Sequence, residues 1–161
     1  MFWRLTKTLL FTLVMPGTVG VYVPQALKDN ANKVPPVFEW VGTAIFLCGI
    51  AIYCWCAWDF VSKGLGTPLP IDAPRVLVMQ GLYRFTRNPM YLAVLAVIFS
   101  QALYYGSGSV AVYGCIVLAL FHVFVRLYEE PTLRRMFGEE YNEYCRKVPR
   151  WILPLPRSMA K

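Results

Sequence analysis

Residues 81–91 combine charged, aromatic and helix-starting side chains at the point where a polar loop meets an apolar run. The segment reads Gly-Leu-Tyr-Arg-Phe-Thr-Arg-Asn-Pro-Met-Tyr. Asn88 is a good helix N-cap and Pro89 a good first helical residue, so we expect a helix to begin here. The free backbone N–H groups of its first turn favour an anionic ligand group. The rings of Tyr83 and Tyr91 could stack on an aromatic ring or contact a cation.

A second polar cluster, residues 126–131, stands at the exit of the next apolar run and reads Arg-Leu-Tyr-Glu-Glu-Pro. His122, Arg126 and Glu130 are spaced four apart, which predicts one polar stripe on a helix. Ionisable side chains in membrane helices usually face a bundle interior or a cavity and are candidates for function. Arg126 could neutralise either carboxylate of the cluster, and Glu130 could pair with Arg134.

Either cluster could instead be ordinary surface structure. Tyrosine and arginine are common at membrane interfaces, so residues 81–91 could serve only as an anchor. Residues 126–131 could be a helix end that leaves the membrane with surface ion pairs, and we expect His122 to be a hydrogen-bonded packing residue. Two helices joined by a short turn would bring both clusters to the same side of a bilayer.

The composition indicates an integral membrane protein. Hydrophobic residues make up 57% of the 161 positions, charged residues make up 16%, and the mean hydropathy is +0.46. Such values are unusual for a soluble protein, and the length suits one domain. The formal charge of +7 is not gathered on one continuous face, so we expect no nucleic-acid partner.

Four apolar segments are predicted to be membrane helices, at about 5–23, 38–61, 89–105 and 110–127. A spanning helix needs about 20 apolar residues, so the second and fourth segments qualify directly and the third is short. The sequence therefore predicts an all-α bundle of about four transmembrane helices. The first segment could instead be a cleaved signal peptide, but no suitable cleavage site follows it.

The distribution of lysine and arginine predicts the orientation of this bundle. One side carries 14 of the 16 basic residues, on the N-terminal flank, in the 62–88 loop and from Arg126 onward. The positive-inside rule then puts both termini and both polar clusters in the cytoplasm. We expect the location to be the inner membrane of a bacterium or an archaeon.

The remaining candidates for chemistry are weak. Five cysteines and one histidine lack the spacing of a metal or redox motif, so no metal site is expected. The proline- and glycine-rich 63–74 loop could cover a cofactor or simply connect two helices.

The chain ends in a predicted amphipathic helix on the cytoplasmic side. Its apolar residues recur at helical spacing: Tyr141, Tyr144, Cys145 and Val148. Gly138 is expected to end the helix before it. The basic pair Arg146 and Lys147 and residues 149–154 suit a membrane surface, so this region is expected to lie over the cytoplasmic helix ends.

Taken in order, these motifs resemble the isoprenylcysteine carboxyl methyltransferase family and, more broadly, the integral-membrane methyltransferases that include phospholipid N-methyltransferases. The resemblance covers residues 63–154 and rests on four segments, 64–68, 81–91, 128–144 and 148–154. It implies one integral-membrane methyltransferase domain over residues 1–161. It also implies a cytoplasmic-facing pocket for S-adenosylmethionine, closed by the C-terminal region, and a lipid-side entrance for a lipid-like or prenylated acceptor.

The resemblance also assigns roles to individual residues. The family's Arg-His-Pro-x-Tyr element corresponds to Arg87, Asn88, Pro89 and Tyr91, and its Glu-Glu element to Glu129 and Glu130. With Tyr83, these residues are the candidate cofactor-binding set. Asparagine replaces the family's histidine at position 88, which argues against a role for imidazole there. Further family positions match Tyr141, Tyr144, Arg150 and Trp151.

The expected reaction is methyl transfer from a sulfonium, an in-line displacement that depends on alignment and on exclusion of water. O-methylation of a carboxylate is the favoured interpretation, because Arg126 could orient the acceptor and no base is required. Amine acceptors, as in phospholipid N-methylation, would need a base, and Glu129 or His122 could serve. Arg126 and Glu129 are therefore the candidate catalytic residues.

Two other functional classes are less well supported by the sequence. Related helical membrane folds carry nicotinamide cofactors, so an NADPH-dependent reductase of the sterol-reductase type is the alternative. Four spans and the element at residues 87–91 favour methyl transfer over that chemistry. A non-enzymatic membrane scaffold is a weaker third hypothesis.

Overall fold

The computed structural model describes residues 6, 12, 14–29, 34–62 and 76–151, and their regular structure is entirely helical, with no strand among them. This confirms the all-α prediction. The 63–75 loop, residues 7–11 of the first apolar segment and residues 152–154 of the last motif lie outside the described part. The elements are the π-helix η1 (Thr18–Tyr22), α2 (Val23–Leu27), α3 (Pro36–Ser62), the 3-10 helix η2 (Gly81–Arg84), α4 (Pro89–Tyr105), α5 (Gly108–Phe124), the π-helix η3 (Val125–Glu129) and α6 (Glu130–Lys147).

Two predicted apolar segments agree closely with helices, 38–61 with α3 and 89–105 with α4, whereas the first helical stretch extends to Leu27 and the fourth continues past residue 127 into α6. The third helix begins at Pro89 and ends at Tyr105, as predicted. Within the described residues, two helices are long and apolar enough to cross a membrane, Pro36–Asp59 and Gly108–Lys147, and α4 is shorter. The second of these continues from α5 through η3 into the first part of α6, and Gly138 breaks it within α6.

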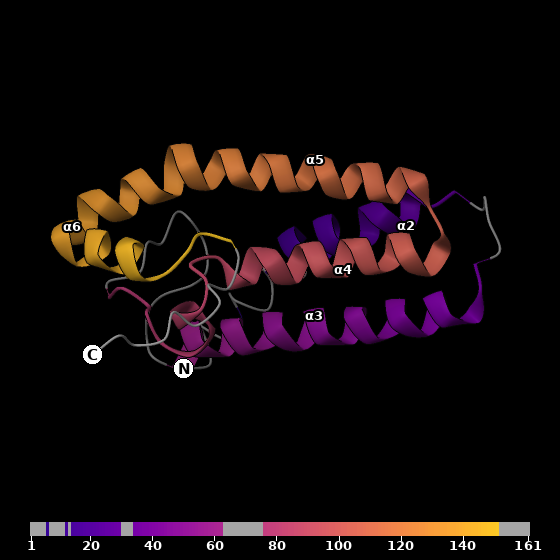
Figure 1. The fold of residues 1–161 in the computed structure, drawn as a ribbon, viewed down its shortest axis with the longest axis horizontal. Helices are drawn as coiled ribbons and strands as arrows, with labels where there is room; N and C mark the ends of the chain where they lie inside the picture. The colour runs from indigo at the N-terminus through magenta and orange to yellow at the C-terminus, as the bar shows by residue number, and fades with distance from the viewer. Residues whose placement is uncertain (1–5, 7–11, 13, 30–33, 63–75, 152–161) are drawn as a thin grey trace.

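The longest helices run side by side along the molecule, with α4 between α3 and α5 (Figure 1). Their apolar side chains form the main core: Tyr53, Ala93, Val94, Leu95, Ile98, Val110 and Val117. At Gly49 the backbones of α3 and α4 come so close that a Cβ atom would lie 2.8 Å from Val97 Cγ2 and 3.1 Å from the Ala93 carbonyl oxygen. Glycine therefore allows this close contact between the two helices.

A tight turn joins α4 to α5 and makes them antiparallel neighbours. Gly106 adopts a left-handed conformation with φ of 59°, which ends α4. The Ser107 hydroxyl then accepts a hydrogen bond from the backbone N–H of Val110 and donates one to the carboxylate of Asp29. As a result, the start of α4 and the end of α5 lie at the same end of the bundle.

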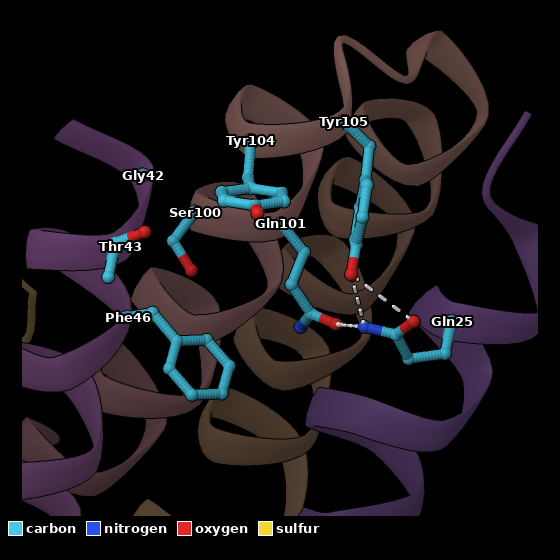
Figure 2. A pocket seen from close by; sticks show the side chains of 8 residues that line it. All are labelled: Gln25, Gly42, Thr43, Phe46, Ser100, Gln101, Tyr104 and Tyr105. Carbon is cyan, nitrogen blue, oxygen red and sulfur yellow. Dashed lines mark hydrogen bonds between the residues drawn. The ribbon is translucent and has the colours of Figure 1, made fainter. Parts of the chain in front are cut away.

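At the opposite end, polar side chains connect α2 to α4 (Figure 2). The Gln101 amide donates to the Gly20 carbonyl at 2.6 Å and accepts from the Gln25 amide at 3.1 Å. Gln25 also donates to the Tyr105 hydroxyl at 2.9 Å. A cavity of about 190 Å³ lies beside this group and extends toward Thr43 of α3. Because these polar groups hydrogen-bond one another, we interpret them as contacts that hold the helices together.

Candidate active site

The two polar clusters meet where α4 begins and where η3 passes into α6. The Tyr91 hydroxyl donates to Oε2 of Glu129 at 2.8 Å, and Nη1 of Arg87 donates to Oε1 of Glu130 at 2.9 Å. Positions about 40 residues apart in sequence are therefore in direct contact. The antiparallel packing of α4 and α5 produces this meeting, as the sequence predicted.

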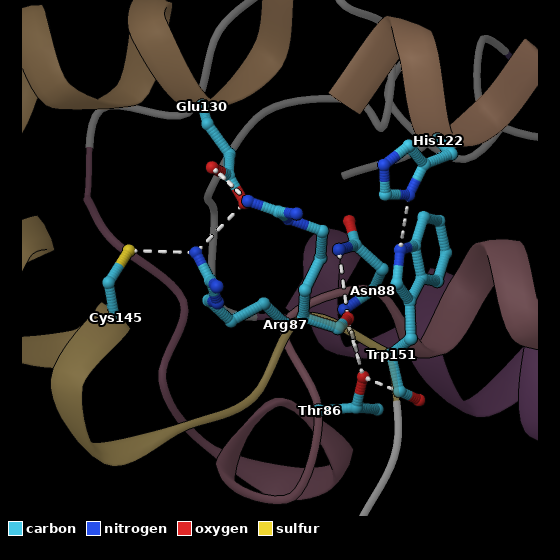
Figure 3. A network of polar contacts seen from close by, with 8 residues as sticks. Thr86, Arg87, Asn88, His122, Glu130, Cys145 and Trp151 are labelled. Carbon is cyan, nitrogen blue, oxygen red and sulfur yellow. Dashed lines mark hydrogen bonds and ion pairs between the residues drawn. The ribbon is translucent and has the colours of Figure 1, made fainter. Parts of the chain in front are cut away.

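Glu130 is the centre of a buried ion-pair cluster (Figure 3). Its side chain is 7% exposed, and its carboxylate contacts two guanidinium groups. Arg150 binds it through two bonds, Nε to Oε1 at 2.6 Å and Nη2 to Oε2 at 3.0 Å, and Arg87 adds the third. Two-point contacts of this kind fix geometry as well as charge. The hydrogen bond to Glu130 raises the pKa of Arg150, so the Arg150 guanidinium stays protonated.

The prediction of Arg126 as a partner of this carboxylate was wrong, because Arg126 is exposed and pairs with neither glutamate among the described residues. Arg134 forms no direct ion pair with Glu130, although its positive charge acts on that carboxylate. The predicted stripe of His122, Arg126 and Glu130 is also wrong, because Glu130 is buried while Arg126 faces outward.

The physical reason is the π-helical turn η3. In a π-helix the N–H bonds the carbonyl five residues earlier, and here the N–H of Glu130 bonds the carbonyl of Val125. The wider turn places Glu130 above Val125, which is 1% exposed, instead of above Arg126. π-turns of this kind occur frequently at functional sites. Nothing in the spacing of apolar residues signalled this change of register.

Glu129 has a different environment from its neighbour. Its carboxylate accepts the hydrogen bond from Tyr91 and forms no ion pair with any residue that the structure describes. The Tyr91 ring lies against Phe121, with 4.7 Å between ring centroids, and the edge of Trp151 is 6.4 Å away. The two adjacent carboxylates therefore differ in their charged neighbours. Among the described residues, two guanidinium groups bind Glu130, whereas Glu129 accepts its hydrogen bond from the neutral Tyr91 phenol.

Asn88 has the predicted backbone position but another side-chain partner. It is the N-cap of α4 and Pro89 is the first helical residue, as expected. The side chain, however, makes no capping bond, and its Nδ2 donates to the carbonyl of Arg150 at 3.0 Å. The expectation of a capping side chain was therefore wrong, because the C-terminal segment provides a competing acceptor.

Residues 148–151, which we call the C-terminal strap, are bound to the start of α4 along their backbone. The backbone N–H of Arg87 donates to the Pro149 carbonyl at 3.0 Å, and the Thr86 hydroxyl donates to the Arg150 carbonyl at 3.0 Å. Sequence reasoning overlooked Thr86, because its acceptor is a backbone carbonyl that no side-chain pattern reveals.

The strap ends on Trp151, which covers His122. The indole Nε1 donates to His122 Nδ1 at 3.1 Å, and the two rings stack with 6.2 Å between centroids (Figure 3). His122 is thus a hydrogen-bonded packing residue, as predicted. Its Nδ1 lone pair is occupied by the indole, so this nitrogen is not available as a base.

The second part of α6 also contacts the segment that leads into α4. Gly138, with φ of 55°, breaks the helix, and the residues after it fold back toward the start of α4 (Figure 1). The break agrees with the predicted helix end at this glycine. Tyr144 then donates to the carbonyl of Tyr83 at 2.6 Å, and both residues are buried. The Tyr83 ring packs with Cys56 and Val78, and burial raises the pKa of its phenol well above its usual range, so it stays neutral.

Arg87 retains capacity for an anionic ligand. Its Nη1 is shared between Glu130 and the sulfur of Cys145, the latter at 2.8 Å. Its Nε is buried and has no hydrogen-bond partner among the described residues. Two guanidinium groups around one carboxylate also leave the cluster with one net positive charge. An unpaired buried donor beside excess positive charge favours a carboxylate or another anion.

The strap should loosen when its side-chain anchors are removed. In the double variant Thr86→Val/Asn88→Ala the Arg150 carbonyl loses both side-chain donors, each contributing about 1 kcal/mol. We expect trypsin to cleave after Lys147 and Arg150 about tenfold faster, measured by mass spectrometry of the released peptides. Asn142→Ala is the control, because among the described residues that amide bonds the exposed Glu139 and no part of the strap. Equal cleavage rates in both variants would contradict this role.

Comparison with known protein families gives a match for this chain. A family model described as "Phospholipid methyltransferase" matches residues 37–140, more than half of the chain. The matched region includes α3, α4, α5 and η3, and with them Arg87, Tyr91, Glu129 and Glu130. No curated protein matches the chain.

Proposed function

Because this chain belongs to the phospholipid methyltransferase family, which implies a membrane methyltransferase, we propose that it transfers a methyl group from S-adenosylmethionine to the amine of a lipid-like acceptor. The proposal includes a bundle of about four spans with the site at the cytoplasmic face. The concentration of basic residues on the side of both clusters supports that orientation.

The residues of the site fit S-adenosylmethionine. The unpaired Nε of Arg87 and the net positive charge of its cluster suit the carboxylate of the cofactor's methionine part. The rings of Tyr91 and Trp151 provide faces for a sulfonium or for adenine. Bound there, the cofactor would supply an electrophilic methyl group. Glu130 contributes by holding the two arginines in place rather than by contacting the ligand itself.

The geometry of the site favours a different methyl acceptor from the one that the sequence predicted. Sequence reasoning favoured a carboxylate oriented by Arg126, yet Arg126 is exposed and forms no ion pair with the described residues. Within the site, Glu129 forms no ion pair with any residue that the structure describes. An anionic carboxylate beside aromatic rings attracts an ammonium group and repels a second carboxylate. This observation carries the choice of an amine acceptor.

Each residue then has a definite task. Glu129 binds the protonated amine and takes one proton from its nitrogen, as a general base must before the nitrogen can form a bond to carbon. Tyr91 holds the Glu129 carboxylate through its hydroxyl, and Trp151 limits the entry of water. The new carbon–nitrogen bond forms as the carbon–sulfur bond breaks, and the sulfur leaves as a neutral thioether.

The test has a binding arm and a reaction arm. Isothermal titration of the purified protein should detect S-adenosylhomocysteine and should give no signal with NADPH, the ligand expected for the reductase alternative. Labelled S-adenosylmethionine should then methylate phosphatidylethanolamine, and mass spectrometry should locate the methyl group on nitrogen. Methylation of a prenylated cysteine carboxylate without reaction of the amine would overturn the choice of acceptor. Failure to bind S-adenosylhomocysteine would overturn the proposed function as a whole.

A further inference from the structure

The basic residues near the proposed cytoplasmic end differ in their surroundings. Arg87 and Arg150 point inward and bind Glu130. On the second part of α6, Arg146 pairs with Glu139 at 2.7 Å and Lys147 with Glu143 at 2.6 Å, although all four side chains are exposed. On the helix that runs from α5 through η3 into α6, three arginines are exposed and form no ion pair with any described residue: Arg126, Arg134 and Arg135.

These three arginines are all exposed on the continuous helix that runs through the π-turn. The turn buries Glu130 with Val125 and leaves Arg126 and Pro131 exposed. Arg134 and Arg135 follow one turn after Glu130 and Pro131 and are also exposed, and the charge of Arg134 acts on Glu130 without a direct ion pair. Large exposed apolar side chains lie among them: Leu127 at 72%, Tyr128 at 48% and Met136 at 45%.

In the proposed membrane orientation, helix length places this part of the helix at the depth of the lipid headgroups. The apolar helix begins at Gly108, and at 1.5 Å per residue a hydrocarbon core of about 30 Å is crossed in about 20 residues. The next few residues pass through the headgroup layer, so Arg126 stands near its inner edge and Arg134 and Arg135 near its outer edge. Long arginine side chains can reach phosphates from either level.

We propose that Arg126, Arg134 and Arg135 form a binding surface for anionic phospholipid headgroups, separate from the site that binds the cofactor. Unpaired guanidinium groups bind phosphate through paired N–H donors, and the neighbouring apolar side chains lie along the upper acyl chains. The inference rests on the proposed membrane orientation, but it does not depend on the methyl acceptor. It also assigns a role to Arg126, which lies outside the candidate active site.

The test compares two double variants on the same helix that remove equal charge. Native mass spectrometry of the detergent-solubilised protein would measure the affinity for short-chain phosphatidylglycerol and for phosphatidylcholine of the same chain length. The wild type should prefer phosphatidylglycerol by about fivefold or more, since each arginine near such headgroups contributes on the order of a fivefold factor. Arg134→Gln/Arg135→Gln should lose this preference, whereas Arg146→Gln/Lys147→Gln should keep it.

Two further measurements make the result decisive. Arg134→Lys/Arg135→Lys retains the charge and should retain most of the preference, which separates loss of charge from loss of fold. S-adenosylhomocysteine binding should be unchanged in all three variants, so failure of this inference is distinguishable from failure of the proposed function. Equal loss of lipid preference in both glutamine variants, or no preference in the wild type, would overturn the proposed surface.

Discussion

Glu129→Gln is expected to reduce methyl transfer by about 10²- to 10⁴-fold, the usual contribution of a general base. Glutamine has the same shape and can still accept the hydrogen bond from Tyr91, but it cannot take a proton from the acceptor amine. Binding of S-adenosylhomocysteine and thermal stability should therefore remain close to those of the wild type. The measurement is the initial rate of label transfer to phosphatidylethanolamine, together with isothermal titration of the cofactor product.

A matched control separates this effect from a general loss of acidic charge. Glu143→Gln removes a carboxylate that is exposed and pairs only with Lys147, so its rate should stay within about twofold of the wild type, as expected for exposed pairs. Tyr91→Phe should give a smaller loss than Glu129→Gln, because it removes the group that positions the carboxylate and leaves the base. Full activity of Glu129→Gln toward an amine would exclude the proposed base.

Glu130→Gln is expected to destabilise the fold by about 3 kcal/mol, because removal of one partner leaves two guanidinium groups without their counter-charge in a buried setting. The side chains of Arg87 and Arg150 are only 11% and 27% exposed, so water cannot fully replace the lost carboxylate. Repulsion between the arginines should also displace the C-terminal strap and weaken binding of S-adenosylhomocysteine. Unfolding in mixed detergent with increasing dodecyl sulfate measures the stability, and titration measures the binding.

Glu139→Gln is the control for this prediction, because it breaks an ion pair of the same type on the protein surface. Its side chain is 74% exposed and that of Arg146 is 68% exposed, so the expected loss is below about 1 kcal/mol. Tighter cofactor binding in Glu130→Gln would show that the carboxylate blocks the site. That outcome would contradict the assignment of Glu130 as the residue that holds the two arginines.

Much of the fold could be predicted because it depends on local chemistry. The start of α4 follows from Asn88 and Pro89, and the break in α6 follows from Gly138. The meeting of residues 81–91 with residues 126–131 follows from two apolar helices joined by a short turn. Turn residues and apolar runs act through their immediate neighbours, so the sequence records them directly.

The pairing of charges could not be predicted in the same way. Spacing along a helix suggested Arg126 and Arg134 as partners of Glu130, but the observed partners are Arg87 and Arg150. These side chains come from separate segments of the chain, and a one-residue shift at η3 decides which face of the helix meets them. A shift of this size leaves the apolar composition unchanged, so the sequence pattern carries no sign of it.

The sequence by itself therefore determined the helical elements, their ends and the side of the bundle on which the charged residues gather. Apolar content, helix-starting residues and the placement of lysine and arginine each act over a few positions, which is why they can be read without a structure. Only the tertiary structure decided that, among the described residues, Glu130 binds two arginines and Glu129 forms no ion pair. That distinction arises because packing of α4, η3 and the C-terminal strap brings Arg87 and Arg150 to Glu130 and the Tyr91 hydroxyl to Glu129.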